Sequence, residues 1–157
     1  MRINVGISEM RVTKQSGVIL VTHSLGSCMG LAAYDPIYRV AGLIHCLLPK
    51  PAGNKKAMEN PAMCVSTGVP AMIREMYSMG AQRQNLVLKA AGCSRMMNVL
   101  NQFNTGLRNQ ETLLALLKHN ALKLAASEMG GSIPRTMYLL VDTGRVLIRS
   151  KREEREL

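Results

Sequence analysis

A cysteine and a histidine in this chain are placed where they could act together as a nucleophile and its base. Cys28 follows Gly26 and Ser27 at a glycine-containing turn, and His45 lies inside the apolar run 40–49. A free thiol has a pKa of about 8.5, so it needs a neighbouring imidazole to attack well at neutral pH. If the two segments form adjacent strands, their spacing brings the imidazole to the thiol.

The residues before Cys28 offer the other groups that such a mechanism needs. A glycine at position 26 lets a substrate approach the backbone closely, so we expect Gly26 and Ser27 to bind substrate or a developing oxyanion. The hydroxyl of Thr22 would orient the imidazole if its strand lies alongside. A second interpretation stays open, because buried cysteines are usually inert and a histidine in an apolar run is often a satisfied core residue.

The remaining cysteines give no metal-binding pattern. Cys46 follows His45 directly, so on a strand the two side chains point to opposite faces. A zinc site built from Cys28, His45 and Cys46 is therefore not expected, and the usual ligand spacings are missing. Cys64 and Cys93 are interpreted as small buried apolar residues. We expect neither a metal nor an organic cofactor.

The elements that must position these residues are mostly strands. Short apolar runs, some alternating with polar residues and some rich in β-branched types, are bounded by turn signals such as Asp35-Pro36. The polar segment 50–56 is interpreted as a loop. The expected strands are 3–7, 17–22, 29–34, 40–48, 86–91, 122–126, 136–141 and 145–149.

One helix is expected over 61–79. Asn60 can cap it, Pro61 suits the first helical position and Gly80 follows its end. Pro70 argues against a regular helix, because an interior proline removes a hydrogen bond and crowds the preceding turn. We therefore expect a kink or a later start.

A second helix is expected over 110–119, with Asn109 as its cap and basic residues at its negative end. Two main helices and about eight strands predict an α+β fold in which helices cover one side of a mainly antiparallel sheet. Residues 1–157 are expected to form a single domain, and the charged segment 151–157 a flexible tail.

Composition restricts the classes of partner. The chain has 157 residues, a formal net charge of +10, one Phe and no Trp. The basic charge favours acidic partners, but the scarcity of aromatic residues and the lack of a recognisable module argue against nucleic acid. No apolar run reaches the ~20 residues that span a membrane, and no signal peptide is recognised. We expect a cytoplasmic protein with reduced cysteines.

Several short motifs occur in a characteristic order along nearly the whole chain, and in this order they resemble the chemoreceptor glutamine deamidase family, CheD. In that family a G-S-C turn and an H-x-x-L-P run carry the nucleophile and the base. The matching segments here are Thr22, 25–28, 34–36, 42–49, 80–81, 89–92, 104–109, 130–131, Arg135 and 143–146.

The resemblance implies an α/β/β layered sandwich that hydrolyses protein glutamine side chains to glutamate and releases ammonia. It assigns Cys28 as nucleophile, His45 as general base and Thr22 as the residue that orients His45. It implies substrates on the cytoplasmic helices of chemotaxis receptors, with methyl esters as further substrates of some members, and a CheC-type phosphatase as a second partner. It implies no cofactor, no nucleic acid and no membrane insertion.

The chain departs from the family pattern at three positions. Cys93 stands where a second glycine is expected after Gly92, and His23 and Ser24 stand where an apolar residue and a glycine are usual. His23 would compete as a base, alter the pH profile or point to solvent, and we favour the last. Two other functions stay open: a module that mainly binds the CheC-type phosphatase, and an unrelated cysteine hydrolase.

Overall fold

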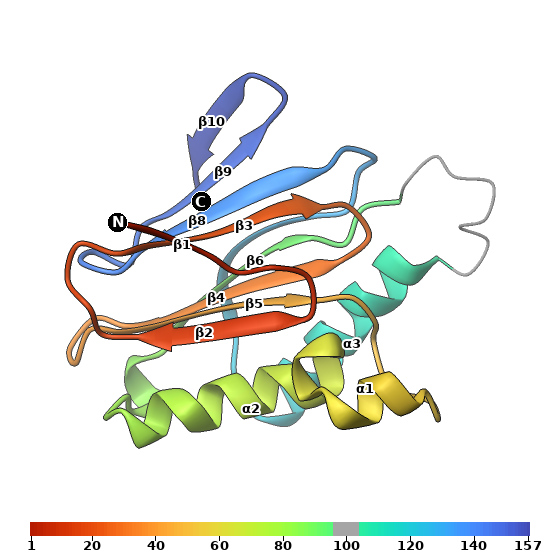
Figure 1. Cartoon of the computed structure of the whole chain (residues 1–157), viewed down its shortest axis with the longest axis horizontal. Coiled ribbons are helices and arrows are strands. Elements are labelled where there is room, and N and C mark those ends of the chain that lie inside the picture. The colour runs from red at the N-terminus through yellow and green to blue at the C-terminus, as the bar shows by residue number, and fades with distance from the viewer. Residues whose placement is uncertain (96–103) are drawn as a thin grey trace.

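The computed structural model describes residues 1–95 and 104–157 and arranges them in three layers (Figure 1). Helices cover one face of a five-stranded sheet, and a second five-stranded sheet lies on its other face. One apolar core fills the space between helices and sheet, and another fills the space between the two sheets. The predicted α/β/β sandwich is confirmed.

The inner sheet lies between the two cores. Its strand order is β2-β5-β4-β6-β7, and its central strands β4 and β5 are buried at every position. One face of these strands meets the helices and the other meets the second sheet, which explains their nearly continuous apolar sequences. The strands span Glu9–Thr13 (β2), Met29–Asp35 (β4), Val40–Cys46 (β5), Val87–Gly92 (β6) and Leu124–Met129 (β7).

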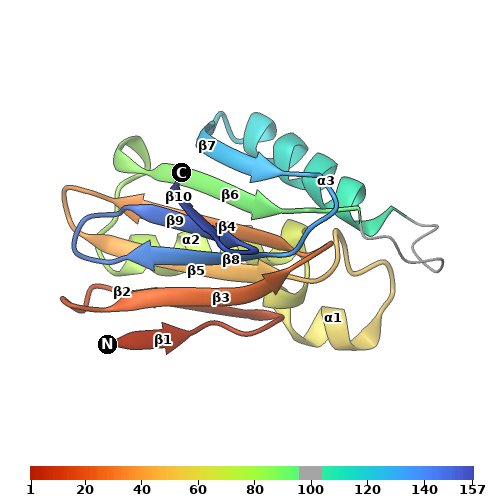
Figure 2. The same cartoon turned by 90° about the horizontal axis from the view of Figure 1, so that it is seen from above.

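The outer sheet has the order β1-β3-β8-β9-β10 and lies over the inner one (Figure 2). Six of the eight strand pairings are antiparallel, but β1 with β3 and β6 with β7 are parallel. Both sheets are therefore mixed, although antiparallel pairing dominates as predicted. The strands span Arg2–Asn4 (β1), Ile19–Leu25 (β3), Arg135–Leu140 (β8), Val146–Ser150 (β9) and Glu153–Glu156 (β10).

The C-terminal residues are a strand and not the flexible tail that the mixed charges suggested. Strand β10 pairs with β9, and Arg145 forms an ion pair with Glu156 at 2.6 Å. Arg155 bonds to Glu128 of β7, and Leu157 packs against the core between the sheets. Backbone pairing with the adjacent β9 holds this segment, and the bond from Arg155 to Glu128 connects it to a strand of the other sheet that its sequence alone does not reveal.

The first helical region begins later than 61, one of the two outcomes expected. Residues Pro61–Met63 form a short 3-10 turn capped by Asn60, and helix α2 runs over Val65–Ser78 with Pro70 inside it. Helix α1, Lys55–Glu59, was not predicted; it overlaps the expected loop and is capped by Asn54. None of the helices in the described ranges is long and apolar enough to cross a membrane.

Helix α3 spans Thr105–His119 and begins well before the predicted position 110. Its first turn packs directly on the backbone of Cys93 and Ser94, since a Cβ at Gly106 would collide with the Ser94 carbonyl. Asn109 is consequently an interior residue of the helix and not its cap. The close approach allowed by Gly106 carries Asn109, one turn later, into the buried interior.

We predict that Gly106→Ala destabilises the protein by about 2 kcal/mol, because overpacking against backbone outweighs the better helix propensity of alanine. Urea unfolding measures the change, and the exposed neighbour substitution Arg108→Ala is the control. A stability gain from Gly106→Ala would contradict the close packing of α3 on the Cys93–Ser94 backbone.

Candidate active site

The side chains of Thr22 and His45 meet between the two sheets. Thr22 Oγ1 lies 2.7 Å from His45 Nδ1 and 2.7 Å from the carbonyl oxygen of Val5. A hydroxyl has one proton, and a carbonyl can only accept, so Thr22 donates to Val5. Its oxygen therefore accepts from Nδ1–H of His45, which leaves the lone pair of the imidazole on Nε2.

The Nε2 atom of His45 is buried and has no hydrogen-bond partner in the part of the chain that the structure describes. Burial lowers the pKa of His45 from 6.5 to about 4, because a charged imidazolium is poorly solvated in the core. At neutral pH the side chain is therefore a neutral imidazole whose basic nitrogen is available.

Strand register places Cys28 on the same face as His45. In the pairing of β4 with β5, Gly30 lies opposite His45. Opposite residues share a face, and Cys28 precedes Gly30 by two positions, so its side chain also points between the sheets. It packs in that core and is only 6% exposed. Thr22 and His45 therefore come from strands β3 and β5, Cys28 comes from the turn just before β4, and all three face the same interior layer.

Cys46 points to the opposite face of β5, as predicted. Its side chain lies in the core between the inner sheet and the helices, whereas Cys28 lies between the sheets. Within residues 1–95 and 104–157, no group of three or more His, Cys, Asp or Glu side chains is arranged to hold a metal ion.

Burial also shifts the pKa of the Cys28 thiol. It raises the pKa of Cys28 to about 11, an effect partly offset by the residue's own backbone N–H, which hydrogen-bonds the sulfur. A desolvated thiolate is unfavourable in the same way as a desolvated imidazolium. The resting pair at neutral pH is therefore a neutral thiol and a neutral imidazole.

The turn that carries Cys28 is held through three consecutive carbonyl oxygens. Each accepts a hydrogen bond from a donor outside the turn, at 2.8 to 2.9 Å. Anchored carbonyls fix the orientation of the peptide planes, and with them the N–H groups. The pairs are Ser94 N–H to Gly26 O, Asn109 Nδ2 to Ser27 O, and Cys93 N–H to Cys28 O.

The N–H groups of the turn are not equivalent. The Gly26 N–H donates to Ser24 O at 2.9 Å, so it is engaged. The N–H groups of Ser27 and Cys28 have no backbone acceptor in the described ranges. Of the turn residues expected to bind an oxyanion, Ser27 has an N–H without a backbone acceptor in the described ranges, whereas the Cys28 N–H is directed at its own sulfur and the Gly26 N–H is engaged within the turn.

Arg135 supports the same turn from the outer sheet. Its buried guanidinium donates to Ser94 Oγ at 2.9 Å and to Gly92 O at 3.3 Å, and it pairs with Glu128 at 2.6 Å. Ser94 in turn holds Gly26. The ion pair satisfies a buried charge whose hydrogen bonds fix the backbone beside Cys28.

Asn109 is the residue of this site that sequence reasoning assigned only to a helix cap. Its side chain is fully buried, and Nδ2 bonds Ser27 O and, at 3.3 Å, Leu47 O. A signal was present in the sequence: Gly106, Asn109, Leu113 and Leu117 form the buried face of α3. A polar residue on an otherwise apolar helix face must find buried partners.

A β-bulge in β3 explains the two departures next to Thr22. Thr22 pairs with Met137 and Leu25 with Arg135, so β3 contains one extra residue at this point. Both His23 and Ser24 are exposed, while Leu25 returns to the core. The expectation that His23 points to solvent is confirmed; its nearest polar partner is Thr136, at 3.4 Å.

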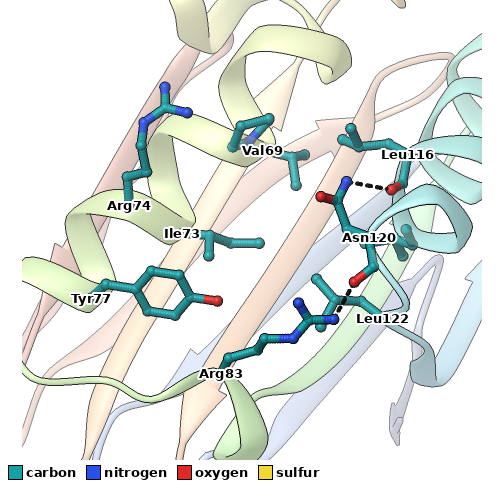
Figure 3. A pocket seen from close by; sticks show the side chains of 10 residues that line it. Val69, Ile73, Arg74, Tyr77, Arg83, Leu116, Asn120 and Leu122 are labelled. Atoms are coloured by element: carbon teal, nitrogen blue, oxygen red, sulfur yellow. Dashed lines mark hydrogen bonds between the residues drawn. The ribbon is translucent and has the colours of Figure 1, made fainter.

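A separate groove lies in the helical layer between α2 and α3 (Figure 3). It has a volume of about 310 Å³, and Tyr77 and Arg83 border it together with apolar side chains. Arg83 is bound to the Asn120 carbonyl at the end of α3. None of the residues of the candidate site lines this groove.

Comparison with known families identifies the chain. The family model described as CheD chemotactic sensory transduction matches residues 47–150. A protein of Symbiobacterium thermophilum is 38% identical over 147 residues, which cover 92% of this chain and 89% of the relative. A protein of Thermococcus kodakarensis is 40% identical over 151 residues, covering 95% and 92%. The chain belongs to the CheD family. Both relatives are named probable chemoreceptor glutamine deamidase CheD.

The CheD family model begins at residue 47, after Thr22, Cys28 and His45. The roles of these three residues therefore depend on the geometry described above. Among solved structures, the Bacillus licheniformis hypothetical protein YfiH aligns with a TM-score of 0.46 and 13% identity, over 78% of this chain and 49% of that one. A likeness this weak carries no argument about function.

We predict that Ser24→Gly stabilises the protein by about 1 kcal/mol, because Ser24 adopts a left-handed conformation with φ of 59° that costs a residue with a Cβ about that amount. Thermal unfolding at neutral pH measures the gain. Ser16→Gly, at an exposed position without positive φ, is the control and should not stabilise. An equal change in both variants would contradict the assignment of strain to Ser24.

We also predict that His45 makes the protein less stable in mild acid. The unfolded chain binds a proton at His45 below pH 6.5, whereas the folded protein does so only near pH 4, so stability falls as pH falls through this window. The loss should reach about 3 kcal/mol. Chemical unfolding at pH 7 and pH 4.5 measures it; His45→Gln should lose the dependence and the exposed His23→Gln should keep it.

Proposed function

We propose that this protein hydrolyses glutamine side chains of chemoreceptors to glutamate and releases ammonia. Cys28 is the nucleophile, His45 the general base and Thr22 the group that orients His45. The observation that carries the proposal is the hydrogen bond from His45 Nδ1–H to Thr22, which leaves Nε2 free on the face that also holds Cys28. The names of the CheD relatives support the substrate class.

The first half of the reaction forms a thioester. The Cys28 sulfur attacks the carboxamide carbon while its proton passes to His45 Nε2. The carbonyl oxygen becomes negatively charged and accepts hydrogen bonds from the N–H groups of Ser27 and Cys28. The imidazolium then returns the proton to the departing nitrogen, the carbon–nitrogen bond breaks, and ammonia leaves.

The second half regenerates the enzyme. His45, again neutral, takes a proton from a water molecule that attacks the thioester carbon. The same two N–H groups stabilise the second tetrahedral intermediate. The carbon–sulfur bond breaks, Cys28 recovers its proton from His45, and the product is a glutamate side chain.

The pKa values of the pair determine when the proton moves. The pKa of His45 is lowered to about 4 and that of Cys28 is raised to about 11, both by burial. A preformed thiolate–imidazolium pair requires the opposite order of pKa values. These shifts support general-base catalysis as the proposed mechanism, in which the thiol loses its proton as it attacks.

Charge supports an acidic protein partner. The formal net charge of +10 complements receptor helices rich in glutamate, and such complementarity accelerates association. The four cysteines are free thiols, which accords with the proposed location in a reducing cytoplasm. A CheC-type phosphatase is the second partner that the family resemblance implies, and the assay below separates that role from deamidation.

We predict that a receptor fragment incubated with the wild type gains about one dalton for each glutamine converted to glutamate. Cys28→Ala should abolish the conversion, since no nucleophile remains. Thr22→Val should lower the rate about tenfold or more, because the imidazole loses a buried hydrogen bond that fixes its tautomer. Mass spectrometry of the fragment measures each rate.

Two variants serve as controls for this assay. Thr22→Ser restores the hydroxyl and should recover most of the activity, and Cys64→Ala removes a buried thiol outside the site and should retain it. No conversion by the wild type, together with intact binding of a CheC-type phosphatase, would favour the binding-module function. Cleavage of small amides or peptides in place of the receptor would favour an unrelated cysteine hydrolase.

A further inference from the structure

Two buried side-chain polar atoms lack a hydrogen-bond partner within the described residues: His45 Nε2 and Asn109 Oδ1. A buried polar atom without a partner costs about 1–3 kcal/mol, so each needs an explanation. The proposed mechanism accounts for Nε2, which exchanges a proton with Cys28 and the leaving nitrogen. It does not account for Oδ1.

The orientation of the Asn109 side chain is fixed by its neighbours. Nδ2 lies 2.9 Å from Ser27 O and 3.3 Å from Leu47 O. Both partners are carbonyl oxygens that only accept, so the nitrogen must occupy this position and the oxygen the other one. The amide thereby lies against the peptide that joins Ser27 to Cys28 and beside the segment that follows His45.

The substrate carries a hydrogen-bond donor that could pair with Asn109 Oδ1. A glutamine carboxamide has one oxygen, which accepts from the N–H groups of the Cys28 turn, and an NH₂ group that donates two hydrogen bonds. Asn109 Oδ1, on the amide that lies against the Ser27–Cys28 peptide, is an unpartnered acceptor for such an NH₂ group, whereas His45 Nε2 takes the Cys28 proton in the proposed mechanism.

We propose that Asn109 Oδ1 accepts a hydrogen bond from the carboxamide NH₂ of the substrate and so selects amides at the site; this inference rests on the proposed deamidase function. In the tetrahedral intermediate the bond leaves the lone pair of the nitrogen free to take the proton from the His45 imidazolium. The glutamate product has no N–H to donate, and its carboxylate is repelled by Oδ1. The same oxygen therefore favours substrate binding and product release.

A purely structural function of Asn109 predicts a different result. The bonds from Nδ2 to Ser27 and Leu47 clamp the nucleophile turn, and their loss would slow every reaction of Cys28 alike. Recognition through Oδ1 concerns only substrates that have an N–H donor. A glutamate γ-methyl ester has the same shape as glutamine and lacks that donor, so comparing the two substrates separates the two functions.

The test compares kcat/KM on a receptor fragment carrying one glutamine with kcat/KM on the same fragment carrying a γ-methyl glutamate at that position. Asn109→Leu should lower the amide-to-ester ratio about tenfold, the value of one buried hydrogen bond. Asn109→Asp loses the clamp donor but keeps an acceptor oxygen, so both rates should fall while the ratio stays near that of the wild type. Arg108→Ala, on the exposed side of α3, is the control and should change neither value.

A binding measurement keeps the inference testable if Asn109 variants fold poorly. In Cys28→Ala, which retains Asn109, calorimetry should give a dissociation constant about tenfold lower for the glutamine fragment than for the ester fragment. Equal affinity here, or equal losses on amide and ester in Asn109→Leu, would overturn the inference while leaving the deamidase function intact. Failure of the wild type to convert either fragment would overturn the proposed function as well.

Discussion

The hydroxyl of Thr22 is the contact on which the arrangement of the site depends. It connects a carbonyl that follows β1, at Val5, with an imidazole of the inner sheet, so one hydrogen-bonded group spans the space between the sheets. Because the hydroxyl has one proton and a carbonyl neighbour, the tautomer of His45 follows without further assumption. The α/β/β sandwich matters for function chiefly because it lays β3 over β5 and makes this contact possible.

The burial that orders the site also keeps the side chains of Cys28 and His45 uncharged. Enclosing His45 and Cys28 between the sheets moves their pKa values apart in the direction that leaves both uncharged. Among the residues that the structure describes, His45 Nε2 and Asn109 Oδ1 are buried without hydrogen-bond partners, which a well-packed protein does not normally tolerate. In the proposed mechanism a donor-bearing substrate supplies the missing partners, whereas the expected acid sensitivity comes from the burial that lowers the pKa of His45.

Local patterns in the sequence predicted the elements but not the contacts between distant segments. Continuous apolar runs indicated β4 and β5, because both faces of these strands are buried. The alternation of side chains along a strand correctly predicted that His45 and Cys46 point to opposite faces of β5. Strand β10 was missed because its charged sequence gives no strand pattern, while its pairing with β9 and its bond to Glu128 appear only in the folded protein. The beginning of α3 was missed because it depends on close packing of Gly106 against a turn that precedes it by about a dozen residues.

The two departures from the family pattern at Ser24 and Cys93 concern positions where the backbone has an unusual conformation. The two positions where glycine is usual, Ser24 and Cys93, both have positive φ, at 59° and 53°. Such a conformation costs about 1–2 kcal/mol for a residue with a Cβ. In this chain the backbone adopts that conformation with a side chain present at both positions: the β-bulge at Ser24 returns Leu25 to the core, and the Cys93 N–H holds the Cys28 carbonyl. The backbone at these positions, and not the two side chains, therefore makes the contacts that fix the path of the chain around Cys28.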